Sequence, residues 1–430
     1  MKKMASIGYR LTRLLVLLAL SLSVVSCAGN SLQPSSLQPA SPVAKLATDT
    51  QQSDLIFAVA GDSRAGVSGQ SDFWIDPSKQ PDYTNYINTQ VLGALRDNLI
   101  TTWKDSPGFF LMHLGDIGMR GGTPIFEAFK QEMSPMKNAG IPVYLTIGNH
   151  ELRYYKPKEN GSGTGKAESD ANTLKAQQEY QATIGTSMIP SDANSLQFYE
   201  GGLAYSFKRE VGGVSSLFIV LDAYYVNYDD PKKPEYKKGY YSDFQLKWLQ
   251  DTLKNNQNAQ NIFVFSHQPA FDANGGAGKL YNNYNSPDSD RSNWILWALL
   301  DTYKVDAYFT GHSHFYHRWN VIGNTFEYKW KDTWRALDSN FTTLGELKDH
   351  KEYTYLIPQV VNGSCGASLQ GFAGNSVPAA KRENAYNYSI VQVKGSTITV
   401  EVYSYDVTTQ PKLIDKFQKQ GDQWQTLPLN

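Results

Sequence analysis

The stretch VDAYFTGHSH, residues 305–314, is a short run of β-type residues that ends on Gly311 and a His-x-His pair. Runs of roughly four to eight apolar and β-branched residues predict strands, here Val305–Thr310. Four further runs are similar, because each is followed, directly or after one glycine, by a residue with a carboxylate, amide or imidazole side chain. They are Leu55–Ala60 before Gly61-Asp62, Phe109–Leu114 before Gly115-Asp116, Pro142–Ile147 before Gly148-Asn149-His150, and Asn261–Ser266 before His267.

Helical patterns separate several of these strands. Tyr86–Trp103 carries apolar residues at positions 87, 91, 92, 95 and 99, a spacing typical of a helix with one buried face. Asp243–Asn255 and Arg291–Tyr303 are also predicted helices. Strands that alternate with helices indicate a layered α/β domain.

A second group of strands has no helices between its members. Leu203–Arg209 and Ser215–Asp222 flank Gly212-Gly213 and predict a hairpin. The other predicted members, which we expect to be antiparallel, are Tyr353–Val361, Asn387–Val393 and Thr397–Tyr403.

Charge is balanced over the whole chain of 430 residues. The 40 Lys and Arg residues face 41 Asp and Glu residues, for a formal net charge of -1. Such a chain has no overall field that attracts nucleic acid, and its sequence has no basic patch or base-stacking motif. We therefore expect no nucleic-acid partner, and any attraction for an anionic substrate must be local.

The N-terminus resembles a bacterial export signal. Basic residues precede the apolar run Leu14–Val25, which is too short to span a bilayer and suits the core of a signal peptide. Val24-Val25-Ser26-Cys27 resembles the lipobox of bacterial lipoproteins, whose cysteine is lipidated. The alternative is a plain signal peptide with a chance cysteine. The lipobox predicts an exported protein, anchored to the membrane through lipidated Cys27 at the bacterial cell envelope and facing away from the cytoplasm.

The sequence divides into four predicted segments. Residues 1–27 form the signal peptide, 28–54 a Ser-, Gln-, Pro- and Ala-rich flexible tether, 55–410 the catalytic domain and 411–430 a C-terminal extension. Cys365 has no intramolecular partner if Cys27 is lipidated, and we expect it to be a small buried side chain.

The polar residues at the five strand ends are expected to lie close together. In open α/β sheets, ligands collect beyond the carboxyl ends of the strands. This edge would bring together Asp62, Asp116, Asn149, His267, His312 and His314. Each residue alone has an ordinary structural explanation, as a turn cap or a hydrogen-bonded histidine, and only the ordered set is specific. Mixed carboxylate, amide and imidazole ligands suit zinc, manganese or iron better than calcium.

The order of these motifs resembles that of the calcineurin-like metallophosphoesterases. Gly-Asp, Gly-Asp, Gly-Asn-His-Glu, a strand-end His and Gly-His-x-His follow one another between about Asp54 and Asp406. The stretch GHSHFYHR, Gly311–Arg318, is similar to the purple acid phosphatase branch of that family. The resemblance implies a four-layer α/β/β/α sandwich, in which two mixed β-sheets are flanked by helices.

The resemblance also implies a centre of two transition-metal ions, divalent or mixed-valence, with iron, zinc or manganese as candidates. In the family the second Asp bridges the two ions, and that residue is Asp116 here. Asn149, His267 and His312 would hold one ion, called the first here, and Asp62 and His314 would complete the ligands of the second. His150 matches the family residue that contacts the substrate and protonates the leaving group.

The ligands of the second ion depart from the family pattern. Most members have Asp-x-His at the first motif, whereas this chain has Asp62-Ser63-Arg64. Purple acid phosphatases instead supply a Tyr three residues after the bridging Asp, where this chain has Met119. A guanidinium has no lone pair to donate, so we expect the second ion to be weakly held. Arg64 either binds a substrate phosphate oxygen or pairs with a nearby carboxylate and shapes the loop.

Two functions are compatible with these motifs. The first is an acid phosphatase-like phosphomonoesterase or phosphodiesterase that uses a metal-bridging hydroxide as nucleophile, His150 as general acid and Arg64 as a contact to a small phosphoester. The alternative is a non-catalytic surface lipoprotein that binds phosphorylated ligands on the same fold. His150 favours the enzyme, because a pure binding protein gains little from a general acid.

Overall fold

The computed structural model describes residues 54–64, 87–153, 170–185, 187–195, 203–227, 235–271, 287–321, 355–372 and 380–429. All of them belong to the unit that begins at Pro39. The predicted signal peptide, Cys27 and the predicted tether up to residue 53 lie outside the described residues.

Seven strands form the first sheet, in the order β17-β16-β15-β14-β1-β2-β3. Its parallel strands are β1 (Leu55–Ala60), β2 (Phe110–His113) and β3 (Val143–Leu145). Its antiparallel strands are β14 (Asn387–Lys394), β15 (Thr397–Ser404), β16 (Lys412–Gln420) and β17 (Gln423–Thr426). The three predicted strands that end on Gly-Asp or Gly-Asn therefore lie side by side in this sheet.

Eight strands form the second sheet, in the order β13-β11-β12-β10-β9-β6-β5-β4. Its parallel strands are β6 (Val214–Leu221), β9 (Asn261–Ser266), β10 (Ala307–Thr310) and β12 (Ile357–Asn362). Its antiparallel strands are β4 (Asn194–Ser195), β5 (Tyr205–Val211), β11 (Tyr316–Val321) and β13 (Lys381–Glu383). A separate ribbon pairs β7 (Tyr224–Asn227) with β8 (Glu235–Lys238).

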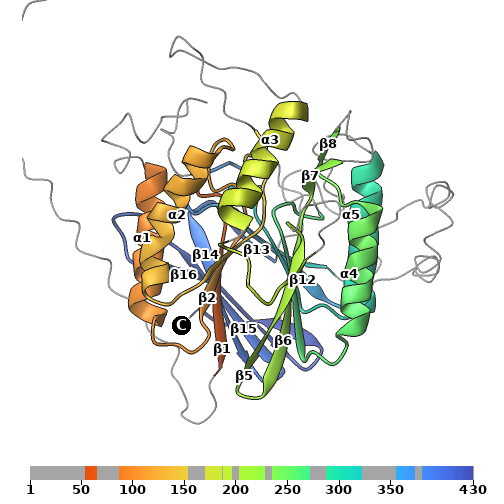
Figure 1. The fold of residues 1–430 in the computed structure, drawn as a ribbon. Helices are drawn as coiled ribbons and strands as arrows, with labels where there is room; N and C mark the ends of the chain where they lie inside the picture. The colour runs from red at the N-terminus through yellow and green to blue at the C-terminus, as the bar shows by residue number, and fades with distance from the viewer. Residues whose placement is uncertain are drawn as a thin grey trace, which may run out of the picture. The chain divides into compact units, whose positions relative to one another are not determined.

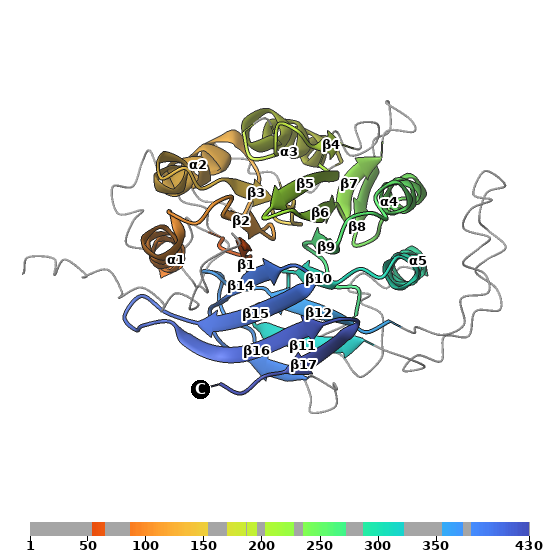
Figure 2. The same ribbon diagram turned by 90° about the horizontal axis from the view of Figure 1, so that it is seen from below.

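Helices cover the outer face of each sheet, as Figures 1 and 2 show. The first sheet is covered by α1 (Ile87–Trp103) and α2 (Thr123–Asn138), and the second by α4 (Asp243–Asn255) and α5 (Pro287–Thr302). In the sequence between α2 and α4, helix α3 (Asp170–Tyr180) leads into the π-helical turn η2 (Gln181–Gly185). The predicted four-layer α/β/β/α sandwich is confirmed. In the part of the chain that the structure describes, no helix is both long and apolar enough to cross a membrane.

The two sheets pack through an aromatic core. Successive side chains of a strand point to opposite faces, so in β1 Leu55, Phe57 and Val59 face the core between the sheets, while Ile56 and Ala58 face the helices. The ring of Phe57 lies 5.1 Å from that of Phe263 and 5.3 Å from that of Phe110. Such pairs add about 0.5–1.5 kcal/mol each beyond the burial of their area. This core fixes the carboxyl ends of β1, β2 and β3 relative to those of β9 and β10.

Three features differ from the sequence predictions. The segment 411–430, expected as a C-terminal extension, supplies β16 and β17 to the first sheet, because Ile414, Phe417 and Trp424 are buried in the core between the sheets. The strand expected at Tyr353–Val361 is antiparallel only to β11, and it runs parallel to β10. Helix α2 was not predicted, although five buried apolar residues from Ile125 to Met136 give it a continuous inner face.

Candidate metal centre

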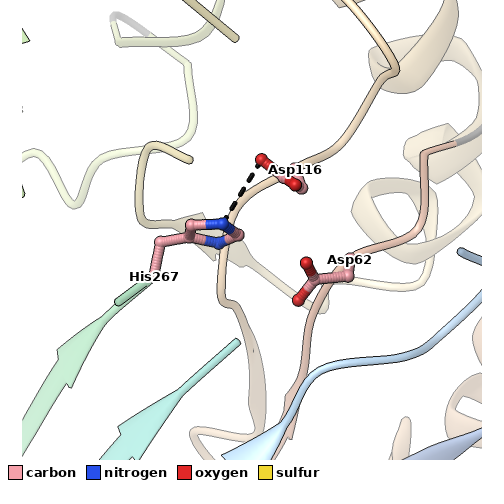
Figure 3. Close-up of side chains that lie close together, drawn as sticks. All are labelled: Asp62, Asp116 and His267. Atoms are coloured by element: carbon pink, nitrogen blue, oxygen red, sulfur yellow. Dashed lines mark ion pairs between the residues drawn. The ribbon is translucent and has the colours of Figure 1, made fainter. Parts of the chain in front are cut away.

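The predicted site residues meet where five strands end. Asp62 follows β1, Asp116 follows β2, and His267 directly follows β9. One ligand atom from each of these three buried residues lies within 4.8 Å of the other two, and Figure 3 shows the three side chains pointing into one space. Asn149 follows β3 and His312 follows β10, so both sheets contribute to the same group.

The loops at these strand ends have an unusual backbone. Among the described residues other than glycine, five have positive φ, and four of them are Asp62, Arg64, Asp116 and His312, at 58°, 41°, 53° and 70°. Such conformations cost energy and persist where the surroundings enforce them, often at functional sites. Strain therefore concentrates at the carboxyl ends of β1, β2 and β10.

Two glycines permit a close approach of backbone to carboxylate. A Cβ on Gly148 would lie 2.3 Å from Asp116 Oδ1, and one on Gly311 would lie 2.4 Å from Asp62 Oδ2. Both distances are too short for any side chain, so the Gly of Gly-Asn-His and the Gly of Gly-His-x-His are required by the packing of the site itself.

Four donor atoms converge at the first half of the centre, which we define by Asp116, Asn149, His267 and His312. His267 Nε2 lies 3.2 Å from Asn149 Oδ1, 3.2 Å from His312 Nδ1 and 3.4 Å from Asp116 Oδ1. Asn149 Oδ1 and His312 Nδ1 are 3.0 Å apart. Ligands about 2.1 Å from one ion are about 3.0 Å apart in octahedral geometry and about 3.4 Å apart in tetrahedral geometry. The spacing therefore fits a single transition-metal ion.

The hydrogen bonds of His267 support the same conclusion. Its Nδ1 lies 2.7 Å from the carbonyl oxygen of Leu114 and donates to it, so Nε2 carries a lone pair. Asn149 Oδ1 also offers only lone pairs, yet the two atoms face each other at 3.2 Å. A proton on the neighbouring His312 Nδ1 can form a hydrogen bond with only one of these two acceptors at a time, whereas a metal cation can bind the lone pairs of both.

The second half of the centre, defined by Asp62 and His314, has fewer donors. His314 Nδ1 donates to the carbonyl oxygen of Ser368 at 2.7 Å, which leaves the Nε2 lone pair directed at Asp62 Oδ1, 3.6 Å away. Within the described part of the chain, this buried Nε2 has no hydrogen-bond partner. Asp62 also accepts the backbone N–H of His312 at 2.9 and 3.2 Å. This half therefore offers two ligand residues of its own, whereas the first half offers three beside Asp116.

Arg64 is paired with the carboxylate of Asp116. Its Nε and Nη2 donate to Asp116 Oδ2 at 3.3 and 3.0 Å, and its side chain is 16% exposed. Of its two predicted roles, the structure shows the pairing with a carboxylate, and that carboxylate is the expected bridging ligand. The contact to a substrate phosphate stays a prediction.

His150 is buried beside the same carboxylate. Its backbone N–H donates to Asp116 Oδ1 at 3.0 Å, and its Nε2 lies 3.8 Å from Asp116 Oδ2. Nδ1 lies 2.8 Å from the carbonyl oxygen of Met119 and donates to it. Nε2 then accepts from Nη1 of Arg153 at 2.9 Å. Sequence reasoning assigned no role to Arg153, because nothing in the motif marks it.

Glu151 is a second residue to which sequence reasoning gave no role. Its Oε2 accepts the backbone N–H groups of Gly148 and Asp116 at 2.6 and 2.9 Å, and its Oε1 accepts that of Ile117 at 2.7 Å. This buried carboxylate therefore ties the loop after β2 to the loop after β3. The only signal in the sequence was its place at the end of Gly-Asn-His-Glu.

Burial sets the charge state of the ligands. It lowers the pKa of His267 and of His312, and it lowers the pKa of His314 to about 3. These imidazoles are uncharged near neutral pH and keep lone pairs for a metal. Burial opposes ionisation of Asp116, but the Arg64 guanidinium and the backbone N–H of His150 hold its pKa well below the usual range. Burial, and then the charge of Asp116, raises the pKa of Asp62. A cation between the two carboxylates would relieve this repulsion.

The comparisons with known proteins agree with the geometry. The family model of the calcineurin-like phosphoesterases matches residues 85–316, which is more than half of the chain. The chain belongs to the calcineurin-like phosphoesterase family. It is 27% identical over 205 residues to purple acid phosphatase 23 of Arabidopsis thaliana, a match that covers 47% of this chain and 34% of that protein. The chain thus matches about a third of the length of that curated relative.

Solved structures show the same fold. A purple acid phosphatase, PPD1, from yellow lupin (Lupinus luteus) seeds superposes with a TM-score of 0.53 at 17% identity, covering 86% of this chain and 54% of that one. PhoD superposes with a TM-score of 0.55 at 12% identity, covering 91% of this chain and 73% of that one. Asp62 precedes the matched residues 85–316, so its place in the centre rests on the structure alone.

Proposed function

We propose that the chain is a metal-dependent hydrolase of small phosphate esters, with acid phosphatase-like specificity. The observation that carries the proposal is the convergence of Asp116, Asn149, His267 and His312 at the spacing of ligands around one ion. Membership of the phosphoesterase family supports a phosphoester as the substrate. Similarity to purple acid phosphatases supports the narrower assignment.

The donor set suits zinc, manganese or iron, since it mixes imidazole with carboxylate and amide oxygen. Asp62 and His314 face a second position beside Asp116, whose Oδ2 is paired with Arg64. When bound, such ions lower the pKa of water toward neutrality and supply the attacking hydroxide. Positive charge then gathers locally, which draws in a phosphate although the whole chain has a formal charge of -1.

The side chains around Asp116 provide the rest of the chemistry. The guanidinium groups of Arg64 and Arg153 supply fixed positive charge for the phosphate oxygens. His150 Nε2, 3.8 Å from Asp116 Oδ2, is placed to protonate the leaving oxygen. To do so it must exchange the hydrogen bond that it accepts from Arg153 for a proton of its own.

The proposal is tested by metal content and turnover together. The full chain, freed of metal with a chelator, is reloaded with zinc, manganese or iron and assayed on a chromogenic aryl phosphate and on its bis-ester between pH 4 and 9. We expect hydrolysis that depends on added metal. The ratio of the two rates measures the preference for monoester or diester.

The alternative is a surface lipoprotein that binds phosphorylated ligands without turnover. The incomplete second half of the centre motivates it, because Arg64 stands where a metal ligand was expected. Less than one bound metal per chain and no hydrolysis with any of the three metals would favour the alternative and exclude the enzyme.

The role of His150 has its own test. His150→Ala removes the side chain that faces Asp116 Oδ2 while leaving every proposed metal ligand in place. We expect unchanged metal content and a turnover reduced by about 10²–10⁴-fold, the usual contribution of a general acid. Undiminished turnover would remove this role from His150.

We further propose that the protein is anchored to the cell envelope through lipidated Cys27. The support is the apolar run Leu14–Val25 followed by the lipobox-like Val24–Cys27. In a bacterial host, radiolabelled palmitate should be incorporated into the wild type and not into Cys27→Ser, which should also leave the membrane fraction. Equal labelling of the two proteins would refute the anchor.

A further inference from the structure

The two oxygens of Asp116 face different partners. Oδ1 lies 3.4 Å from His267 Nε2 and belongs to the first half of the centre. Oδ2 points the other way and accepts both hydrogen bonds from Arg64. Since a second ion needs a share of this carboxylate, Arg64 holds the oxygen that would serve it.

The contact is built into the fold rather than made by a loose surface side chain. The backbone N–H of Arg64 donates to the carbonyl oxygen of Asp116 at 2.9 Å. Its own carbonyl oxygen accepts from Asn88 Nδ2 at 3.0 Å, and Ser63 Oγ donates to the carbonyl oxygen of Ile117 at 3.1 Å. These bonds fix the loop after β1 against the loop after β2, with the Arg64 backbone in a left-handed conformation, φ 41°.

The second half of the centre is short of ligands for the same reason. Apart from Asp116, only Asp62 and His314 face it among the residues predicted as metal ligands. Replacement of a histidine by Arg64 removes one lone pair and adds a permanent positive charge. A divalent ion entering beside that guanidinium meets repulsion, and the low-dielectric surroundings of a buried site strengthen it.

We propose that Arg64 takes the place of the second ion, so that the chain holds one ion tightly, at the first half of the centre. Asp116 keeps a positive partner on each oxygen, the bound ion on Oδ1 and the guanidinium on Oδ2. A phosphate is then held between one metal ion and one arginine instead of between two metal ions. This inference rests on the proposed function and specifies its metal count.

Metal stoichiometry tests the inference without any activity measurement. Metal-free full-length wild type is titrated with Mn2+ by calorimetry, and the bound metal is counted by mass spectrometry after dialysis. We expect one tight ion per chain and the electron paramagnetic resonance spectrum of an isolated Mn2+ ion. Arg64→His restores Asp-x-His and should bind the second ion at least about tenfold more tightly, with the spectrum of a coupled ion pair. Arg64→Lys is the matched control, because it keeps the charge and should still bind one ion.

The outcomes separate this inference from the proposed function. Two ions bound by the wild type with similar affinity, or a coupled-pair spectrum from it, would overturn the replacement by Arg64 and leave the proposed hydrolase intact. No tight ion at all would overturn the proposed function itself. The wild-type titration decides the question even if Arg64→His does not fold.

Discussion

The two halves of the metal centre are both built from residues that follow strands, but the groups that complete their ligand sets differ. In the first half, His267 Nε2 lies 3.4 Å from Asp116 Oδ1 and 3.2 Å from both Asn149 Oδ1 and His312 Nδ1. In the second half, the closest pair of donors, His314 Nε2 and Asp62 Oδ1, is 3.6 Å apart, and Arg64 holds Asp116 Oδ2. Residues at strand ends therefore supply ligands to both halves. Residue 64, an arginine here, decides whether a metal ion or a guanidinium pairs with Asp116 Oδ2 in the second half.

Removing the shared carboxylate gives the largest expected effect. Asp116→Asn keeps the size of the side chain, and Asn tolerates the positive φ of 53° at this position. Loss of the charge leaves the three neutral donors of the first half without an anionic ligand and frees Arg64. We expect metal affinity to fall by more than about a hundredfold and hydrolysis to fall below detection. Titration calorimetry and the aryl phosphate assay measure both.

Circular dichroism and the thermal midpoint of Asp116→Asn serve as the control for folding. A folded variant that still binds metal with wild-type affinity would show that Asp116 is not a ligand of either half.

The two halves can be separated with a pair of histidine substitutions. His312→Ala removes a donor of the first half, and we expect the affinity for the tight ion to fall by about tenfold to a hundredfold. His314→Ala removes a donor of the second half and should change that affinity by less than about threefold, since Arg64 already occupies its side of Asp116. Calorimetric titration of the two variants side by side makes the comparison. Equal losses in both would mean that the halves act as one site.

The loop that carries Asp116 should be sensitive to Glu151. Glu151→Gln keeps the shape but turns one acceptor oxygen into an amide donor, which then faces a backbone N–H of Gly148, Asp116 or Ile117. We expect a loss of about 2–4 kcal/mol of unfolding free energy, from weaker bonds and one unsatisfied buried donor. Denaturant unfolding of the metal-free protein measures it. An unchanged midpoint would mean that the carboxylate does not hold these loops.

Much of the fold was predictable because several strands of this chain end just before a candidate ligand residue. The strands Leu55–Ala60 and Asn261–Ser266 were predicted with the bounds that they have, since each is a continuous buried run that stops at a polar residue. Helix Asp243–Asn255 was predicted to the residue, and Ser242 caps it by accepting the backbone N–H of Gln245. Strand β16 was missed because its buried positions include the charged residues Asp415 and Lys419, which dilute its apolar content.

The positions of the candidate ligands were predictable for the same reason, but their contacts with neighbouring residues were not. The six expected metal ligands converge, because all of them follow strands whose carboxyl ends meet. Glu151 and Arg153 gave no signal, since their importance lies in contacts with backbone N–H groups and with His150 that the sequence does not encode locally. The choice between two roles for Arg64 also needed the structure, because it depends on where Asp116 Oδ2 points.

The smallest effect that we expect concerns the strand behind the second half. His317 lies on β11, just after His314, and is fully buried, and neither of its ring nitrogens has a hydrogen-bond partner in the described part of the chain. Burial, and then the charges of Arg382 and Arg318, lower its pKa to about 4. Below the usual value of about 6.5 the unfolded chain binds a proton that the folded chain does not, so stability falls as the pH drops from about 6.5 toward 4.

His317→Leu should remove the part of the acid dependence of stability that His317 causes. At pH 5.5 protonation of His317 in the unfolded chain lowers the unfolding free energy of the wild type by about 1.4 kcal/mol relative to neutral pH. The variant should not show this loss. The measurement is the change in unfolding free energy between pH 7.5 and 5.5 in both proteins, from denaturant titrations without metal. Comparing each protein with itself at two pH values cancels any packing difference that leucine introduces. If both proteins lose the same free energy on acidification, His317 does not contribute to the acid sensitivity of the fold.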